Sequence, residues 1–264
     1  MHTLAFMNQK GGVGKTTTTV NAGAALALAG KRVGMIDLDP QAHLSINYGL
    51  DPSEKRASLY DVLLNDLPIT EAFHNVGTNL SVVPADIDLA GAEIELVSTL
   101  GRELVLRKRL SAQMLPFDYL LLDCPPALGL LTINGLACSN AVIVPMQAHF
   151  LALQGVAKLL ETVRLVNQRM NPSLKVGGIV LTMFDAQAKL SAEVIHELET
   201  FINASRGKSL PWSEARVFNT RIRRNIKLAE CPSFGQPIFD YDPDSNGATD
   251  YKKLAAELID AFPT

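Results

Sequence analysis

The sequence predicts a single-domain α/β fold in which helices cover both faces of a mostly parallel, twisted sheet. Short apolar runs alternate with segments of helical periodicity along the chain, which is the pattern of repeated strand–helix–strand units. Two of the apolar runs, residues 120–122 and 142–144, lack polar alternation, as is typical of strands buried on both faces. No stretch rich in Pro, Gly or Ser divides the chain, so we expect one domain over residues 1–264.

The expected elements follow in chain order. Strands are predicted at residues 3–8, 32–37, 80–84, 119–123, 141–145 and 176–182. Helices are predicted at residues 16–29, 89–113, 153–170, 192–204 and 251–262. Polar and turn-forming residues gather in segments 203–211 and 240–246, which we expect to be surface loops.

The composition excludes several classes of protein. Hydrophobic residues make up 47% and charged residues 19%, which is the balance of a globular chain and not of a disordered one. No apolar run reaches the roughly 18 residues of a membrane span, and the N-terminus lacks a basic signal-peptide region, so we expect a cytoplasmic protein. The three cysteines form no C-x-x-C pair, which favours free thiols over disulfides or zinc. Since the net charge is −3, any binding to nucleic acid must depend on a local basic patch.

A glycine-rich segment between a predicted strand and a predicted helix carries the most information. Its glycines at 11, 12 and 14 allow backbone N–H groups to converge on phosphate oxygens, and the helix that follows directs its positive end at the same anion. Lys15 is expected to reach the β- and γ-phosphates, and the Thr16 hydroxyl to coordinate Mg²⁺. The strict G-x-x-x-x-G-K-[ST] pattern fails only at its first glycine, which is Gln9, while a second lysine, Lys10, stands at the mouth of the loop. The segment therefore predicts a P-loop NTPase fold.

Three aspartates are expected beside this loop. Asp123 ends an apolar strand, so its side chain emerges at the carboxyl edge of the sheet, where it can hold Mg²⁺ through a water molecule. Asp37 and Asp39 follow the neighbouring strand, and a period of two places both on the same side of the chain. One of the pair can serve the metal while the other orients the attacking water.

These motifs resemble those of the ParA/MinD ATPases. The sequence KGGVGKT at residues 10–16 is similar to the deviant Walker A box of that family, residues 33–41 to its second carboxylate motif, and residues 119–126 to its Walker B strand. Similar stretches at 130–134, 182–185 and 223–230 extend the match over most of the chain, and the small, Soj-like ParA proteins are the most similar branch.

The resemblance implies a site and a mechanism. It implies binding of ATP and Mg²⁺, with nucleotide contacts from eight consecutive residues: Lys10, Gly11, Gly12, Val13, Gly14, Lys15, Thr16 and Thr17. Lys10 and Lys15 would act on the phosphates, Asp39 would position the water, and Thr16, Asp37 and Asp123 would serve the metal. In this family the signature lysine crosses to the phosphates of the other subunit, so ATP stabilises a homodimer.

A basic segment completes the sequence signals. Seven Lys or Arg residues and one acid lie between residues 206 and 227, which is either a solvated face or a surface for a polyanion. The resemblance favours nonspecific DNA binding, with four candidates, Arg221, Arg223, Arg224 and Lys227. The segment 205–212 is longer than in the usual family pattern. The terminal helix has two bases and two acids, which is not the basic amphipathic anchor of a MinD-type protein, so no membrane partner is expected.

The resulting hypothesis is a slow, Mg²⁺-dependent ATPase whose nucleoid-bound dimer segregates or positions a cargo such as a ParB–centromere complex, with a ParB-like protein as activator. Two alternatives remain open at this point: a MinD-like positioning ATPase for a protein cargo, and an ATP-dependent metabolic enzyme such as an amidoligase on the same fold. A non-hydrolysing regulator is disfavoured because Lys15, Asp39 and Asp123 are all present.

Overall fold

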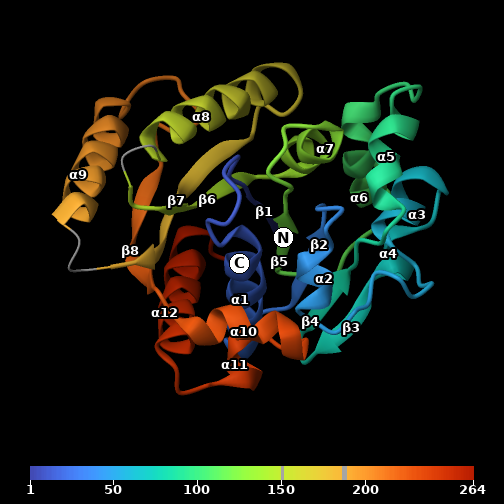
Figure 1. The fold of residues 1–264 in the computed structure, drawn as a ribbon. Coiled ribbons are helices and arrows are strands. Elements are labelled where there is room, and N and C mark those ends of the chain that lie inside the picture. The colour runs from blue at the N-terminus through green and yellow to red at the C-terminus, as the bar shows by residue number, and fades with distance from the viewer. Residues whose placement is uncertain (150–151, 186–188) are drawn as a thin grey trace.

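An eight-stranded sheet runs through the molecule (Figure 1), in the order β3-β4-β2-β5-β1-β6-β7-β8. The computed structural model describes residues 1–149, 152–185 and 189–264. Every neighbouring pair of strands is parallel except β3 and β4. The strands are β1 (His2–Phe6), β2 (Val33–Asp37), β3 (His74–Gly77), β4 (Leu80–Val83), β5 (Tyr119–Asp123), β6 (Ala141–Gln147), β7 (Lys175–Phe184) and β8 (Arg216–Arg223).

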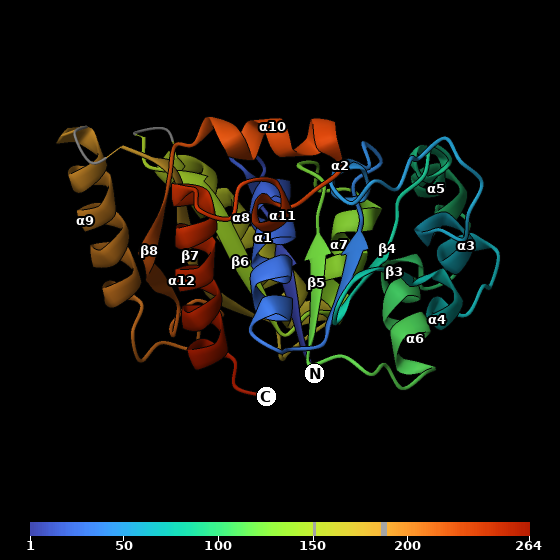
Figure 2. The ribbon, with the colours of Figure 1, turned by 90° about the horizontal axis from the view of Figure 1, so that it is seen from below.

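Helices cover both faces of this sheet, which confirms the predicted fold class (Figures 1 and 2). One face carries α1 (Lys15–Leu28), α11 (Ile238–Tyr241) and α12 (Asn246–Ala261), and α10 (Ile226–Phe234) crosses the edge toward which the strands point. The opposite face carries α3 (Leu59–Leu64), α4 (Ile69–Ala72), α5 (Leu89–Leu96), η1 (Arg102–Leu104), α6 (Val105–Ser111), α7 (Leu130–Cys138) and α8 (Ala152–Arg169). The remaining helices are the short α2 (His43–Ile46) and α9 (Lys189–Ala204) beside β8.

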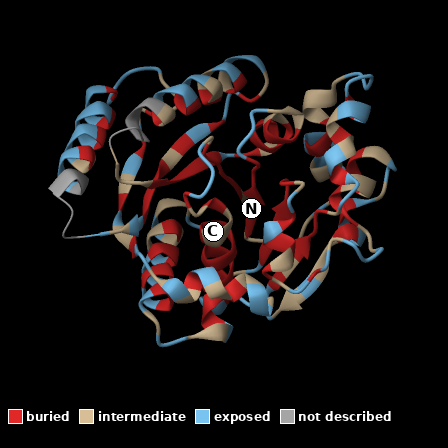
Figure 3. Ribbon diagram, in the orientation of Figure 1, coloured by how far each residue is buried: buried red, intermediate tan, exposed pale blue. Residues whose placement is uncertain are grey.

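Two apolar cores lie against the two faces of the sheet. Side chains from β1 divide between them: Leu4 and Phe6 join the core beneath α1 and α12, whereas Ala5 joins the core beneath α7 and α8. Figure 3 shows the central strands β4, β2, β5, β1 and β6 as an almost continuous buried layer, whereas the edge strands β3 and β8 are partly exposed. Because a parallel sheet covered on both faces has no solvated side, these strands need apolar residues at successive positions.

Helix α1 packs closely on the sheet, and this fixes the position of its first turn. A Cβ on Gly23 would lie 2.5 Å from Met35 Sδ on β2, so any larger residue would force the buried Met35 side chain to move. Most of α1 is buried, including Lys15 at its start. The helix therefore presents its N-terminus at the carboxyl edge of the sheet, next to the ends of β1, β2 and β5.

Parts of the element prediction were wrong. The single helix expected over residues 89–113 is broken into α5, η1 and α6, because the chain turns at Gly101 with a φ of 70°. Strands β3 and β8 were missed: β3 is a four-residue edge strand, and β8 carries three arginines that obscure its alternation.

The segment after α9 is packed against the core. Trp212 is 9% exposed, and its Nε1 donates a hydrogen bond of 3.1 Å to Ser205 Oγ. Trp212 belongs to the same apolar core as Val194, Leu198 and Ile202 of α9. The cysteines are free, with Cys124 and Cys231 buried and Cys138 partly buried. Within the described residues, no helix is both long and apolar enough to cross a bilayer.

Candidate functional site

The glycine-rich loop joins the end of β1 to the start of α1. Gly12 and Gly14 adopt positive φ values of 70° and 77°, which non-glycine residues rarely tolerate. A Cβ built on Gly11 or Gly12 would meet no atom within 4 Å, so the loop backbone is open to a ligand. On the inner side, Thr182 Oγ1 donates a hydrogen bond of 2.7 Å to Val13 O and ties the loop to β7.

A second anchor comes from the residue before the loop. Asn8 Nδ2 donates to Pro145 O at 2.8 Å, and Asn8 Oδ1 accepts from Lys10 N at 3.0 Å. Neither Asn8 nor Thr182 was predicted as a site residue. Both contact the backbone only, so the loop motif itself contains no signal that identifies them.

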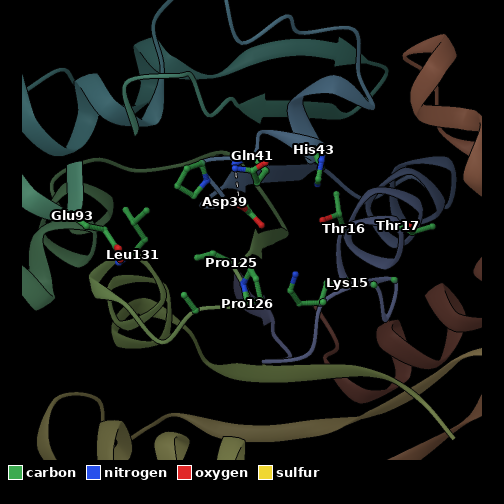
Figure 4. A pocket seen from close by; sticks show the side chains of 15 residues that line it. Lys15, Thr16, Thr17, Asp39, Gln41, His43, Glu93, Pro125, Pro126 and Leu131 are labelled. Atoms are coloured by element: carbon green, nitrogen blue, oxygen red, sulfur yellow. Dashed lines mark hydrogen bonds between the residues drawn. The ribbon is translucent and has the colours of Figure 1, made fainter. Parts of the chain in front are cut away.

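A cavity of about 500 Å³ opens over the loop (Figure 4). Lys15 and Thr16 lie on one side of it, and Glu93 with Leu131 on the other. Of the predicted nucleotide-binding residues, five line the cavity together with Lys15: Gly11, Gly12, Gly14, Thr16 and Thr17. Lys15 is 8% exposed, so its charge stands in a largely enclosed space at the N-terminus of α1. A polyphosphate fits this combination of open N–H groups, helix dipole and buried lysine.

Asp123 is held by two hydroxyls from the first turns of α1. Thr16 Oγ1 donates to its Oδ2 at 2.6 Å, and Thr19 Oγ1 donates to its Oδ1 at 3.0 Å. Because Thr16 gives its proton to Asp123, the lone pairs of its oxygen remain available to a cation. Asp123 is fully buried, and burial raises the pKa of its carboxyl. A hydroxyl and a buried carboxylate form an oxygen donor set that suits Mg²⁺.

Asp37 and Asp39 occupy different positions although they are two residues apart. Asp39 lines the cavity, and its Oδ1 accepts a hydrogen bond from Gln41 N at 3.0 Å. Asp37 lies beneath that turn, fully buried: Ser45 donates to its Oδ2 through Oγ at 2.7 Å and through N at 2.9 Å. Asp37 Oδ1 accepts from Asp39 N at 3.1 Å. The expectation that both face the same side fails because β2 ends at Asp37 and alternation stops there.

The two buried carboxylates are neighbours in the sheet, since Asp37 pairs with Asp123 across β2 and β5. Burial, and then the charge of Asp123, raise the pKa of Asp37 to about 8. The carboxylate oxygens of Asp37 accept hydrogen bonds from the turn that carries Asp39. Asp37 therefore supports the cavity from beneath. A direct part for Asp37 in metal binding remains a prediction.

Lys10 does not line the cavity in this single chain. Its Nζ lies 2.6 Å from His149 Nε2, which follows β6, so the ring nitrogen acts as the acceptor of a lysine proton. Lys10 is exposed at the rim of the loop, whereas Lys15 points inward. The resemblance implies that Lys10 crosses to the phosphates of the other subunit, and this stays a prediction; within one chain, Lys15 lines the cavity and Lys10 lies outside it.

The residues predicted to bind DNA lie at the end of β8 and the start of α10. Arg223 pairs with Asp250 on α12, and Lys227 pairs with Glu230 at 3.2 Å. Arg221 is partly buried and donates to Phe218 O, while Arg224 is exposed. These four residues therefore do not form one continuous basic surface, because two of them are in ion pairs and Arg221 is partly buried.

Two smaller hollows adjoin this basic segment. One, of about 390 Å³, brings Arg221 and Arg223 together with Lys253 of α12, a residue not predicted. The other, of about 320 Å³, is mainly apolar and includes Arg223 and Arg224. It shares Gly14 and Thr17 with the phosphate loop, so it lies directly beside the first cavity.

Sequence reasoning missed other residues of the first cavity. Gln41 and His43 follow the aspartate motif and Pro125 and Pro126 follow Asp123, so their place after strand ends was an available signal. Glu93 comes from α5, inside the helix predicted over 89–113, and no local pattern distinguishes it from an exposed helix residue.

Comparison with known proteins gives full-length matches. Residues 1–176 match the family described as an AAA domain. The chain is 44% identical over 256 residues to the sporulation initiation inhibitor protein Soj of Bacillus subtilis, covering 97% of both chains. It is also 44% identical over 258 residues to the chromosome-partitioning ATPase Soj of Treponema pallidum, covering 97% of this chain and 96% of the relative.

Among solved structures, one similar protein carries a nucleotide. It is described as cobyrinic acid a,c-diamide synthase from Mycobacterium smegmatis with bound ADP and magnesium. The two chains share 37% identity with a TM-score of 0.81, and the match covers 98% of this chain and 94% of the other. The predicted P-loop fold is thereby confirmed.

Proposed function

The chain belongs to the Soj/ParA family of chromosome-partitioning ATPases, and from this premise we propose the function of its site. The protein binds ATP with Mg²⁺ and hydrolyses it slowly. Its ATP-bound homodimer binds DNA without sequence preference and is stimulated by a ParB-like partner that carries the cargo. It acts in the cytoplasm, on the nucleoid.

The observation that carries this proposal is the arrangement of Lys15, Thr16 and Asp123. Phosphoryl transfer needs positioned positive charge and little covalent chemistry from the protein. Lys15 supplies a fixed charge inside the cavity, and Thr16 with Asp123 forms the oxygen set for the metal, 2.6 Å apart. When bound, Mg²⁺ neutralises charge on the phosphates. The magnesium and ADP named for the 37% identical structure support the same ligands here.

The apolar hollow beside the loop provides a place for the adenine base. Gly14 and Thr17 are shared by the two cavities, so a nucleotide whose phosphates lie over the loop can extend directly into the second one. Its walls include Met183, Ile226 and Leu228, which offer apolar surface to a flat ring.

Asp39 is the residue in position to orient a water molecule. Its carboxylate lines the cavity across from Lys15, and the turn below it is fixed by the hydrogen bonds of Asp37. Lys10 is exposed at the rim of the loop, outside the cavity of its own chain. In that position it can contact the phosphates bound by a second protomer. That geometry supports a dimer in which ATP is shared between subunits.

The basic surface supports DNA binding through Arg224, Lys253 and the exposed part of Arg223. Side chains of this kind contact phosphates and carry no base information, so binding is expected to ignore sequence. Because the net charge is −3, attraction to DNA needs a local basic surface such as this one.

A metabolic enzyme on the same fold is the second candidate, because the 37% identical structure is described as a diamide synthase. An amidoligase would consume ATP only with a carboxylic acid and a nitrogen donor, and DNA would not matter. A MinD-like positioning ATPase would instead respond to a protein cargo or to lipid vesicles.

Phosphate release from the purified protein tests these functions. We expect slow hydrolysis that requires Mg²⁺ and stops with EDTA, and co-sedimentation with plasmid DNA in ATP but not in ADP. Co-sedimentation that is equal with and without nucleotide, or hydrolysis that appears only with a carboxylic acid and glutamine, would contradict the proposal. Hydrolysis that responds to lipid vesicles and not to DNA would favour the MinD-like alternative.

A further inference from the structure

Glu93 makes an unusual contact across the cavity from Lys15. It belongs to α5, and its Oε1 accepts a hydrogen bond of 3.1 Å from Leu131 N in the first turn of α7. The N-cap residue of α7 is Gly129, which has no side chain to accept from that turn. A carboxylate from a different helix thus takes the place of a capping side chain, with its charge at the positive end of the helix.

Gly129 is shaped to receive this carboxylate. A Cβ at Gly129 would lie 2.0 Å from Glu93 Oε1 and 2.8 Å from both Cδ and Oε2. Gly129 has a φ of −86°, which any residue adopts, so a side chain here would strain no backbone but would push the Glu93 carboxylate away. The contact is therefore a close fit between one carboxylate and one glycine.

The segment held in this way forms a wall of the phosphate cavity. It runs from the metal-site residue Asp123 to α7, and Pro125, Pro126 and Ala127 line the cavity. Its other support is Thr132, whose Oγ1 donates to Ala127 O at 2.6 Å. Glu93 and Thr132 together fix the segment between Asp123 and α7 from two sides.

The charge of Glu93 has a second consequence. A helix N-terminus attracts phosphate, and Leu131 in the first turn of α7 lines the same cavity as the start of α1. Because Glu93 occupies the N-terminus of α7, α1 is left as the helix whose dipole faces the phosphates.

We propose that Glu93 is a positioning residue for ATP hydrolysis: it holds the wall from Pro125 to Gly129 and reserves the phosphates for the loop at α1. This inference rests on the proposed function. Glu93 acts through the wall and through α7, without touching the reacting atoms, so its removal lowers turnover and leaves nucleotide binding by Lys15 and the loop in place.

The experiment compares Glu93→Ala with Glu93→Gln, Gly129→Ala and the control Glu95→Ala. Glu95 lies on the same helix, is exposed, and accepts from Tyr60 Oη at 3.1 Å. We expect kcat to fall roughly tenfold in Glu93→Ala, as for the loss of one charge-assisted hydrogen bond, while the Kd for ATP changes less than about threefold. The amide oxygen of Glu93→Gln can still accept from Leu131 N, so this variant should recover part of kcat. Glu95→Ala should match the parent.

Gly129→Ala displaces the carboxylate without removing it, so we expect the same fall in kcat. An unchanged kcat in Glu93→Ala or in Gly129→Ala overturns the inference, as does an equal loss of binding and turnover. If Glu93→Ala does not fold, Gly129→Ala and Glu93→Gln decide the question. Failure of the proposed function is distinct, because the parent protein would then release no phosphate from ATP.

Discussion

Arg223 and Asp250 form a two-pronged ion pair, with Nε to Oδ2 at 2.9 Å and Nη2 to Oδ1 at 2.7 Å. Asp250 also accepts from Arg223 N at 3.0 Å, and its side chain is only 5% exposed. Arg223, a candidate DNA contact in the basic segment, thus also links β8 to α12.

Arg223→Ala should therefore lower stability as well as DNA binding. It leaves a nearly buried carboxylate without its partner, which costs about 1–3 kcal/mol. A lower Tm by calorimetry checks this, and the double variant Arg223→Ala with Asp250→Ala should regain part of the loss. A Tm equal to that of the parent would show that solvent satisfies Asp250.

DNA binding is better tested by Arg224→Glu combined with Lys253→Glu, since both side chains are exposed and outside the pair. If each protomer contributes about three basic side chains, the dimer neutralises roughly six phosphates and the slope of log K against log[salt] is about −5. The double variant should lose ATP-dependent DNA binding and keep ATP-dependent dimerisation. Lys55→Glu with Lys108→Glu makes the same charge change elsewhere and should bind DNA like the parent. Equal losses in both variants would mean that added negative charge anywhere on the chain weakens binding, and would contradict the assignment of DNA binding to this surface.

Lys15→Ala should abolish ATP binding, because it removes the enclosed positive charge opposite the β- and γ-phosphates. Isothermal titration with ATP and Mg²⁺ measures it, and the exposed Lys55→Ala is the control. Retention of parental affinity by Lys15→Ala would refute the assignment of the loop.

Asp39→Ala and Lys10→Ala should separate hydrolysis from dimerisation. Asp39→Ala removes the carboxylate that orients the water and leaves the loop intact, so it should bind ATP and accumulate as a dimer. Lys10→Ala should stay mainly monomeric with ATP, because the contact across the dimer is lost. Size-exclusion chromatography with ATP distinguishes them; the reverse pattern contradicts the scheme.

The pair between Arg32 and Asp118 predicts a pH dependence of stability. Hydrogen bonds from the Arg32 side chain and backbone lower the pKa of Asp118 to about 2. A carboxyl whose pKa is depressed on folding stabilises the protein above its unfolded pKa, near 4, and loses this effect as pH falls through 2. The difference in stability between the parent and Asp118→Asn should be constant above pH 5 and shrink between pH 4 and 2 in urea titrations. A difference that does not change with pH would exclude an electrostatic origin.

Sequence patterns predicted the central strands and α1 because burial on both faces leaves long apolar runs. They did not predict β8, because its three arginines, Arg216, Arg221 and Arg223, outnumber its two buried residues, Phe218 and Ile222. The break at Gly101 depends on a positive φ that a helical periodicity does not reveal.

The residues of the candidate site likewise fall into those that a local motif predicts and those that only the fold brings together. Lys15, Thr16 and Asp123 were predictable because their chemistry is local to a loop and a strand end. Glu93, Thr182 and His149 enter the site from other elements, and only the fold brings them there.

Two consecutive residues of α12 contact two different neighbouring elements, β8 and α1. Asp250 holds Arg223 on β8, and Tyr251 Oη lies 3.3 Å from Thr18 Oγ1 on α1, whose hydroxyl in turn donates to Gly14 O of the phosphate loop. A helix turns by about 100° per residue, so one inserted or deleted residue between Ser245, which caps the helix, and Asp250 would rotate both contacts away together. The spacing of residues between Ser245 and Asp250 therefore constrains both the anchor of β8 and the support of the phosphate loop at once.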